Sequence, residues 1–454
     1  MKKSFRIIGS TLVLCFAFIA CEMNEPDLVP EMEETKKANL GMIKSYDNAM
    51  VLTWNEALGK VIDNKMPPAS EARNYVMVSL AVHDALNNVV PIYETYALDN
   101  SLAEYKDISK KNIKSIADAA VAQAAHDVMV AIASASAPSA AILLEESLNS
   151  IEDSDFKTMG IQIGKDAALA LLAERQSDSP LRFQTYTQGT LPGEYRSTMP
   201  YAAENLPNWP ANSAYAPDMG SFRPFGIETG DQFRAIPPYA LDSPEYAADY
   251  NEVMLYGSNT SDVRTQEQAD LGVFFLDNVS NVMNRIARTV AVKEMLDGWE
   301  TARLLALTHI AQFDAHLSSF EGKYHYNRWR PITAIRMGEI DGNDDTTGDP
   351  AWVILQSARA TPPTPTYPST HSEMGGAGAE LFRLFFKKDE ISFKTQSYNL
   401  PGVDRDYSSF SQVAADIAVS RIYIGYHFRN DVEQGVKMGK ELAKYVYDNN
   451  LKRL

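Results

Sequence analysis

Three short segments in the last third of the chain combine cationic, hydroxyl and imidazole side chains. They cover 323–330, 368–371 and 420–431. Their chemically capable residues are Lys323, Arg330, Ser369, His371, Arg421, His427 and Asp431. Several fixed cations beside hydroxyl and imidazole groups suit an oxyanion, because they offset its charge and stabilise a trigonal-bipyramidal arrangement around it. The formal net charge of the chain is -17, so such a cluster is a local exception to a field that repels anions.

The first segment carries Lys323 and Arg330, which are seven residues apart. In a continuous helix this spacing is close to two turns, so we expect both side chains to point the same way. Pro331 is expected to end or redirect the element. The alternative is a solvated basic face, and three neighbouring aromatic residues argue against full solvation: Tyr324, Tyr326 and Trp329.

The second segment reads Pro-Ser-Thr-His over 368–371 and precedes a helical pattern. Pro and Ser in this position are typical of a helix N-cap. A helix N-terminus presents free backbone N–H groups and the positive end of the helix dipole, so it can seat an anion. Ser369 can donate its hydroxyl there, and His371 lies at the rim. The alternative is a plain cap beside a surface histidine.

The third segment places His427 and Asp431 four residues apart, which predicts one helix face. A carboxylate at that spacing can fix the tautomer of an imidazole and raise its basicity. Gly425 permits a break, so that Arg421 and His427 can both turn inward. The alternative is a buried His–Asp pair with a structural role.

Helical spacing dominates the elements that must position these residues, and strand signals are few. The expected helical stretches are 72–89, 115–133, 160–175, 265–275, 280–325, 371–386 and 411–449. We therefore predict an all-α protein. A C-terminal helical bundle, 245–454, houses the site and packs with an N-terminal helical region, 46–176.

Segment 177–244 differs because it is rich in Pro, Gly, Asn and aromatic residues. Such a composition excludes regular helix. The segment is too long for a turn and too aromatic for a flexible linker, so we predict an ordered loop wrapped over the helices. A lid or an oligomer contact is its expected role. The sequence leaves the oligomeric state open, a homo-oligomer included.

The N-terminus has a basic head and an apolar stretch that ends at Ala20-Cys21. This resembles the lipobox of a bacterial lipoprotein signal, with 1–21 as signal peptide, Cys21 as the lipidated residue and 22–45 as an acidic tether. The alternative is an ordinary signal peptide cut nearby. We expect an exported protein, lipid-anchored in the bacterial envelope, either in the periplasm or at the outer membrane.

Composition narrows the remaining possibilities. The chain has 454 residues with 45% hydrophobic content, enough for one large or two ordinary cores. Its two cysteines, Cys15 and Cys21, exclude a disulfide framework and a thiolate metal site in the body. The acidic balance argues against nucleic acid as a partner and against membrane contact other than through the lipid anchor.

Taken in order, the segments spell K-x6-R-P, then P-S-x-H, then S-R-x5-H-x3-D. This pattern resembles the superfamily that joins type 2 phosphatidic acid phosphatases (PAP2), bacterial class A acid phosphatases and vanadium-dependent haloperoxidases. Flanking stretches are similar to soluble bacterial haloperoxidase-type members, and the resemblance extends from about residue 54 to the C-terminus. Those stretches are 264–268, 284–288, 328–336, 361–369 and 420–429.

The resemblance implies a role for each matching residue. Three cations would neutralise the equatorial oxygens of vanadate or phosphate: Lys323, Arg330 and Arg421. Ser369 and the backbone N–H of Thr370 would donate hydrogen bonds. His427 would be the axial ligand of vanadium, or the nucleophile of a phosphatase, oriented by Asp431. His371 would be the general acid–base.

Three functions follow from the resemblance. The first is a vanadium-dependent haloperoxidase-like enzyme that oxidises halide with hydrogen peroxide at bound vanadate. The second is a periplasmic acid phosphatase that hydrolyses phosphomonoesters through a phosphohistidine at His427. The third is a non-catalytic oxyanion-binding lipoprotein. Thr370 stands where the family usually has Gly, and it would be strained if that glycine serves a positive φ.

Overall fold

The computed structural model describes residues 43–454 apart from 102, 104–108, 199–209, 211 and 357–360. The predicted signal peptide, its Cys21 and most of the predicted tether lie outside the described residues, so export and lipid anchoring stay predictions. Residues 42–454 form one compact unit. This unit contains the predicted helical region, loop and catalytic domain.

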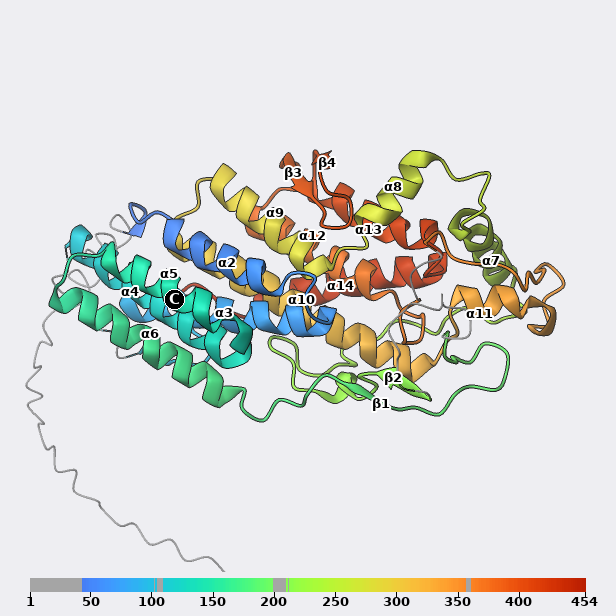
Figure 1. Ribbon diagram of the computed structural model, residues 1–454, viewed down its shortest axis with the longest axis horizontal. Coiled ribbons are helices and arrows are strands. Elements are labelled where there is room, and N and C mark those ends of the chain that lie inside the picture. The colour runs from blue at the N-terminus through green and yellow to red at the C-terminus, as the bar shows by residue number, and fades with distance from the viewer. Residues whose placement is uncertain (1–42, 102, 104–108, 199–209, 211, 357–360) are drawn as a thin grey trace, which may run out of the picture. The chain divides into compact units, whose positions relative to one another are not determined.

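Helices dominate this unit, and the all-α prediction is confirmed (Figure 1). The N-terminal part contributes α2 (Ala49–Ile62), α3 (Pro68–Val89), α4 (Lys110–Ile132), η1 (Ser134–Ser136), α5 (Ala137–Asn149) and α6 (Asp155–Glu174). The middle contributes β1 (Phe183–Thr185), β2 (Ser213–Tyr215), η3 (Met219–Ser221), α7 (Pro244–Gly257), α8 (Gln266–Phe274) and α9 (Val279–Lys293). The C-terminal part contributes α10 (Gly298–Tyr326), α11 (Pro331–Arg336), η4 (Gly338–Ile340), α12 (Thr370–Phe386), β3 (Phe393–Gln396), β4 (Asp404–Tyr407), α13 (Phe410–Tyr423) and α14 (Arg429–Asn449).

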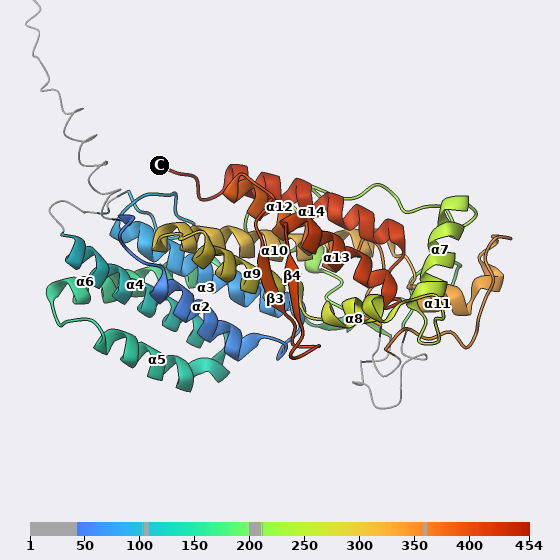
Figure 2. The same ribbon diagram turned by 90° about the horizontal axis from the view of Figure 1, so that it is seen from above.

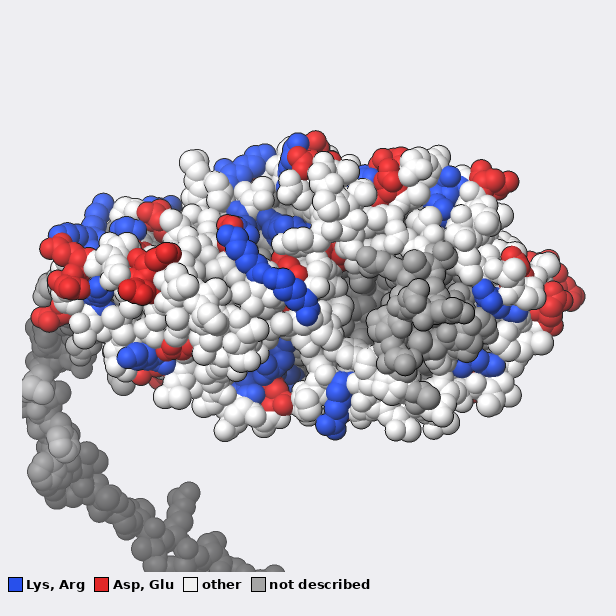
Figure 3. All heavy atoms as spheres, in the orientation of Figure 1, with Lys and Arg blue, Asp and Glu red and all other residues white. Residues whose placement is uncertain are grey.

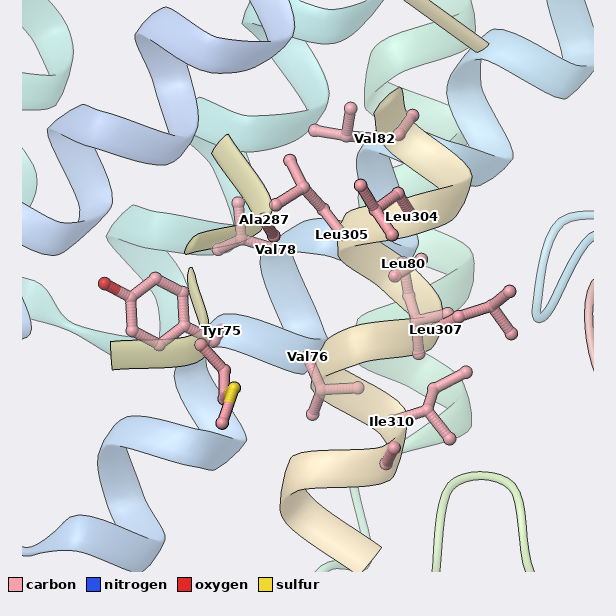
Figure 4. Close-up of a cluster of buried hydrophobic side chains, with 14 of the residues drawn as sticks. Tyr75, Val76, Val78, Leu80, Val82, Ala287, Leu304, Leu305, Leu307 and Ile310 are labelled. Atoms are coloured by element: carbon pink, nitrogen blue, oxygen red, sulfur yellow. The ribbon is translucent and has the colours of Figure 1, made fainter. Parts of the chain in front are cut away.

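Helix α10 is the central element of the unit. It packs against α2 and α3 on the N-terminal side and against α12 and α14 on the C-terminal side (Figures 1 and 2). Asp297 starts it with a capping box, in which its carboxylate accepts from the N–H of Glu300. The α3–α10 contact is made by apolar side chains such as Val76, Leu307 and Ile310 (Figure 4). Burial of this apolar contact between α3 and α10 fixes the orientation of α10, and so the place where its C-terminal end lies.

Helices α12 and α14 pack closely because small residues line their contact. A Cβ added at Gly376 would lie 2.6 Å from the carbonyl oxygen of Val436, and one at Gly435 would lie 2.6 Å from that of Ser369. The backbone N–H of Ser369 donates to the carbonyl of Asp431 at 2.9 Å. Close approach therefore brings the N-terminal ends of the two helices side by side.

The segment 177–244 is ordered where the structure describes it, and it packs on α10. Asp314 of α10 is buried and accepts hydrogen bonds from three consecutive backbone N–H groups, those of Phe225, Gly226 and Ile227, at 2.8, 2.6 and 3.0 Å. Further along, the hydroxyl of Tyr367 donates to the carbonyl of Ile236 at 2.5 Å. A role for this segment as a lid or an oligomer contact stays a prediction.

The strands form small antiparallel pairs. Phe183 pairs with Tyr215 between β1 and β2, and Phe393 pairs with Tyr407 between β3 and β4. Among the described residues, α4 alone is long and apolar enough to cross a membrane, and 67% of its apolar window is buried inside the unit. Packing against other helices thus accounts for its composition.

Candidate oxyanion site

Lys323 lies in the last turn of α10 and is buried. Its Nζ donates to the carbonyl oxygens of Pro365, Thr366 and Pro368 at 3.1, 2.8 and 2.6 Å. Burial, followed by the charge of Arg330, lowers the pKa of Lys323 well below its usual range. Three carbonyl acceptors nevertheless match the three N–H donors of an ammonium group, so the geometry favours its charged form.

Arg330 reaches the same place from a different element. Helix α10 ends at Tyr326, Asn327 is left-handed with φ 50, and Arg330 is the extended N-cap of α11. The helical premise for Lys323 and Arg330 is therefore wrong, because the chain turns between them, although both side chains reach the stretch 364–368. The guanidinium donates from Nε to the carbonyl of Thr364 at 2.8 Å and from Nη2 to its hydroxyl at 2.9 Å. Burial lowers the pKa of Arg330 to about 10, which leaves it charged.

Arg421, in the last turn of α13, completes the cationic set. Its Nη2 donates to the carbonyl of Phe275 at 2.5 Å, and its Nε donates to the hydroxyl of Ser420 at 3.1 Å. Burial lowers the pKa of Arg421 to about 9. Within the described part of the chain, all hydrogen-bond partners of the three cations are uncharged and none of the cations forms a salt bridge. The charge of Asp431 acts on Lys323 and Arg330 through space and balances part of this positive charge. The buried positive charge that is left favours an anionic ligand.

His427 lies in the break between α13 and α14, two residues after Gly425, whose φ is +81. The predicted break is confirmed, but the prediction that His427 and Asp431 share a helix face is wrong. Asp431 belongs to the first turn of α14, and its Oδ2 accepts from the N–H of Phe428 and from Nδ1 of His427, both at 3.1 Å. The pair is thus built on the helix cap.

The tautomer of His427 follows from its neighbours. Nη1 of Arg330 is 3.1 Å from Nε2 of His427, and a guanidinium can only donate. Nε2 therefore carries the lone pair, and Nδ1 carries the proton that Asp431 accepts. Burial, then the charges of Arg330, Lys323 and Arg421, lower the pKa of His427 well below its usual range. The result is a neutral imidazole whose unprotonated nitrogen accepts a hydrogen bond from Arg330.

Ser369 is the N-cap of α12, as predicted, and its hydroxyl oxygen accepts from the N–H of Ser372 at 3.4 Å. Thr370 is the first residue of the helix and has helical rather than left-handed backbone geometry. The expected strain at Thr370 is therefore absent. Its hydroxyl oxygen lies 2.8 Å from that of Ser319 on α10 and so helps to join the two helices.

We expect Thr370→Gly to lower the free energy of unfolding by about 1 kcal/mol, because it removes the Ser319 contact and adds backbone freedom. Affinity for orthovanadate should change by less than about threefold, since the N–H of residue 370 remains. Chemical denaturation and vanadate titration measure the two effects. A gain in affinity of about tenfold or more would mean that the threonine side chain obstructs the seat.

His371 follows in the first turn of α12 and is partly exposed. Burial, then the charges of Arg421, His316 and Lys323, lower its pKa well below the usual histidine range. His371 is therefore a neutral imidazole at neutral pH and can accept a proton. The cations that act on His371 also act on His427.

The structure thus brings the predicted site residues together at the N-terminal ends of α12 and α14, and their individual roles stay predictions. The three cations are buried, so they are not part of the surface in Figure 3, where basic and acidic side chains are mixed over the visible face. Sequence reasoning missed Thr364 and Thr366, whose hydrogen bonds hold the site. Both residues stand in a run of prolines, which has no helical or strand periodicity. The one available signal is that these threonines alternate with prolines directly before the P-S-x-H motif.

Comparisons with known proteins agree with this arrangement. Residues 303–454 match the family model described as "VCPO second helical-bundle domain". The chain is 24% identical over 503 residues to the vanadium chloroperoxidase of Curvularia inaequalis, covering 89% of this chain and 81% of the relative.

Solved structures show the same fold. A bacterial vanadium-dependent iodoperoxidase is 23% identical with a TM-score of 0.68 and covers 90% of this chain and 98% of its own. The apo form of a bacterial vanadium-dependent chloroperoxidase is 15% identical with a TM-score of 0.64 and covers 85% and 94%. The sequence motifs of this chain, the family model and the fold agree: residues 303–454 match the second helical-bundle domain of vanadium haloperoxidases, and the chain is similar to these enzymes over most of its length.

Proposed function

We propose that the site binds vanadate and that the protein oxidises halide with hydrogen peroxide. The observation that carries this proposal is the set of three buried cations whose described partners are all neutral, placed beside an unprotonated histidine nitrogen. These residues fit vanadate: Lys323, Arg330 and Arg421 would balance its charge, Ser369 and the α12 N-terminus would donate to its oxygens, and Nε2 of His427 would be its nitrogen ligand.

When bound, vanadate supplies a Lewis-acid centre that activates peroxide toward halide without changing its own oxidation state. The residues of this chain then bind, orient and move protons. Asp431 keeps the proton on Nδ1 of His427, so Nε2 keeps the lone pair that accepts from Arg330 and that would be offered to vanadate in its place. His371, neutral and partly exposed, takes a proton from incoming peroxide and returns it as the product leaves. The likeness to vanadium chloroperoxidase and iodoperoxidase supports this reading over the others.

Phosphomonoester hydrolysis is the second candidate, because the lone pair on Nε2 of His427 is also what a phosphoryl-accepting histidine requires. The same cations would stabilise the transferring phosphoryl group, and His371 would protonate the leaving oxygen. Binding an oxyanion without turnover is the third. The reason to consider this third function was backbone strain at Thr370, and the helical backbone at Thr370 shows no such strain.

A paired assay separates these functions. One sample is incubated with orthovanadate and then given peroxide with bromide or iodide and a halogen acceptor. The other, free of vanadate, is given an aryl phosphate. We expect vanadate-dependent halogenation of the acceptor and little phosphate release. Phosphate release that vanadate inhibits, with no halogenation, would move the assignment to a phosphatase. Activity in neither sample would leave oxyanion binding alone.

A further inference from the structure

Thr366 touches more of the oxyanion site than any role assigned above requires. It is fully buried in the extended stretch before α12, and its N–H donates to the carbonyl of Arg328 at 2.9 Å. Its own carbonyl accepts from Lys323 at 2.8 Å. Its hydroxyl donates to Oδ2 of Asp431 at 2.5 Å and lies 3.1 Å from Nδ1 of His427. The backbone of Thr366 therefore contacts Arg328 and Lys323, whereas its side chain contacts Asp431 and His427.

A hydroxyl has one proton and two lone pairs. The shortest contact places the proton of Thr366 on Asp431, which leaves the hydroxyl oxygen to share the Nδ1 proton of His427 with Oδ2 of Asp431. The three groups form a closed set, with Arg330 imposing the same tautomer from the Nε2 side. Asp431 and Arg330 hold the imidazole at one point on each of its two nitrogens, which still permits the ring to tilt about the line that joins them. The contact with Thr366 adds a third point that restrains this tilt.

We propose that the Thr366 hydroxyl is a positioning element that fixes the ring of His427, so that Nε2 points into the oxyanion seat. The expected effect on oxyanion binding rests on the proposed function, whereas the positioning of the ring rests on the hydrogen bonds alone. Thr366→Val removes the hydroxyl at nearly constant shape and keeps the carbonyl that holds Lys323. Thr366→Ser keeps the hydroxyl and loses only the methyl group.

The matched control is Thr308→Val. Thr308 is also buried, and its hydroxyl donates only to the carbonyl of Leu304 in its own helix, at 2.7 Å. Thr308 lies four turns of α10 from Lys323. A general cost of replacing a buried threonine hydroxyl will appear in this variant as well.

Two properties of the full chain are measured for each variant. With orthovanadate as probe, Thr366→Val should weaken binding by about tenfold, the loss of one charge-assisted hydrogen bond, while Thr366→Ser and Thr308→Val stay within about twofold. Without any anion, NMR of imidazole-labelled protein should show faster solvent exchange of the His427 Nδ1 proton in Thr366→Val only.

Unchanged Nδ1 exchange in Thr366→Val would overturn the proposal, as would Thr366→Ser behaving like Thr366→Val. If the wild-type chain binds no oxyanion but Nδ1 exchange responds as expected, the positioning role stands and the proposed function fails. Thermal unfolding of each variant identifies any that lose the fold. If Thr366→Val does, Thr366→Ala, which also lacks the hydroxyl, replaces it in the exchange measurement.

Discussion

Replacing His427 with alanine is expected to lower vanadate-dependent halogenation by at least about 10³-fold. Nε2 of His427 is the unprotonated nitrogen beside Arg330, and alanine puts no ligand in its place. The fold should persist, because Asp431 keeps its bonds to Thr366 and to the N–H of Phe428. Steady-state halogenation at saturating vanadate, with unfolding followed in parallel, measures both effects.

The matched control is His325→Ala. His325 lies in the last turn of the same helix as Lys323, but its side chain is exposed. Its replacement should leave halogenation within about twofold of wild type, as is usual for surface substitutions. Wild-type activity in His427→Ala would contradict the assignment of its ring nitrogen to the oxyanion seat.

The largest effect on stability is expected from Gly439→Ala, at about 3 kcal/mol of unfolding free energy or more. A Cβ at Gly439 would lie 2.0 Å from the carbonyl oxygen of Glu373 and 2.7 Å from the backbone N of Ala377. Both atoms belong to the backbone of α12, so neither can move without shifting the helix whose N-terminus carries the site. Urea denaturation measures the loss, and orthovanadate affinity should fall with it.

Gly375→Ala is the matched control in the same bundle. There the new Cβ would meet only the side chain of Ile417, at 3.1 to 3.4 Å, and that side chain can yield. Because alanine also favours helix, stability should stay within about 1 kcal/mol of wild type. If both variants lost the same unfolding free energy, the close packing of α12 on α14 would not be the cause of the loss in Gly439→Ala.

Local signals predicted much of the site. The N-cap at Ser369 could be predicted from the four residues 368–371 alone, and the structure confirms it. The break at Gly425 could be predicted because glycine accepts a positive φ, and it is also confirmed. The approach of Lys323 to Arg330 was predicted for the wrong reason. Seven-residue spacing suggested one helix, whereas the left-handed turn at Asn327 and the start of α11 bring the guanidinium back. No periodicity encodes such a turn.

The parts of the fold that were missed are short or depend on distant contacts. Strand β3 alternates buried and exposed residues over Phe393–Gln396, but four residues are too few to separate this period from chance. Thr366 gives no signal of its own, because its importance comes from Asp431, 65 residues later. Helix lengths and caps are local, whereas the hydrogen bonds that hold the cations join segments far apart in the chain.

The central claim is that buried cations and His427 form a seat for one oxyanion. Titration of the full chain with orthovanadate, followed by vanadium NMR, tests it most directly, with the double variant Arg330→Gln and Arg421→Gln beside the wild type. We predict one bound vanadate per wild-type chain and none in the folded double variant, because the charge that favours an anion is gone. A wild-type chain that binds no vanadate, or a double variant that binds it equally well, would contradict the claim.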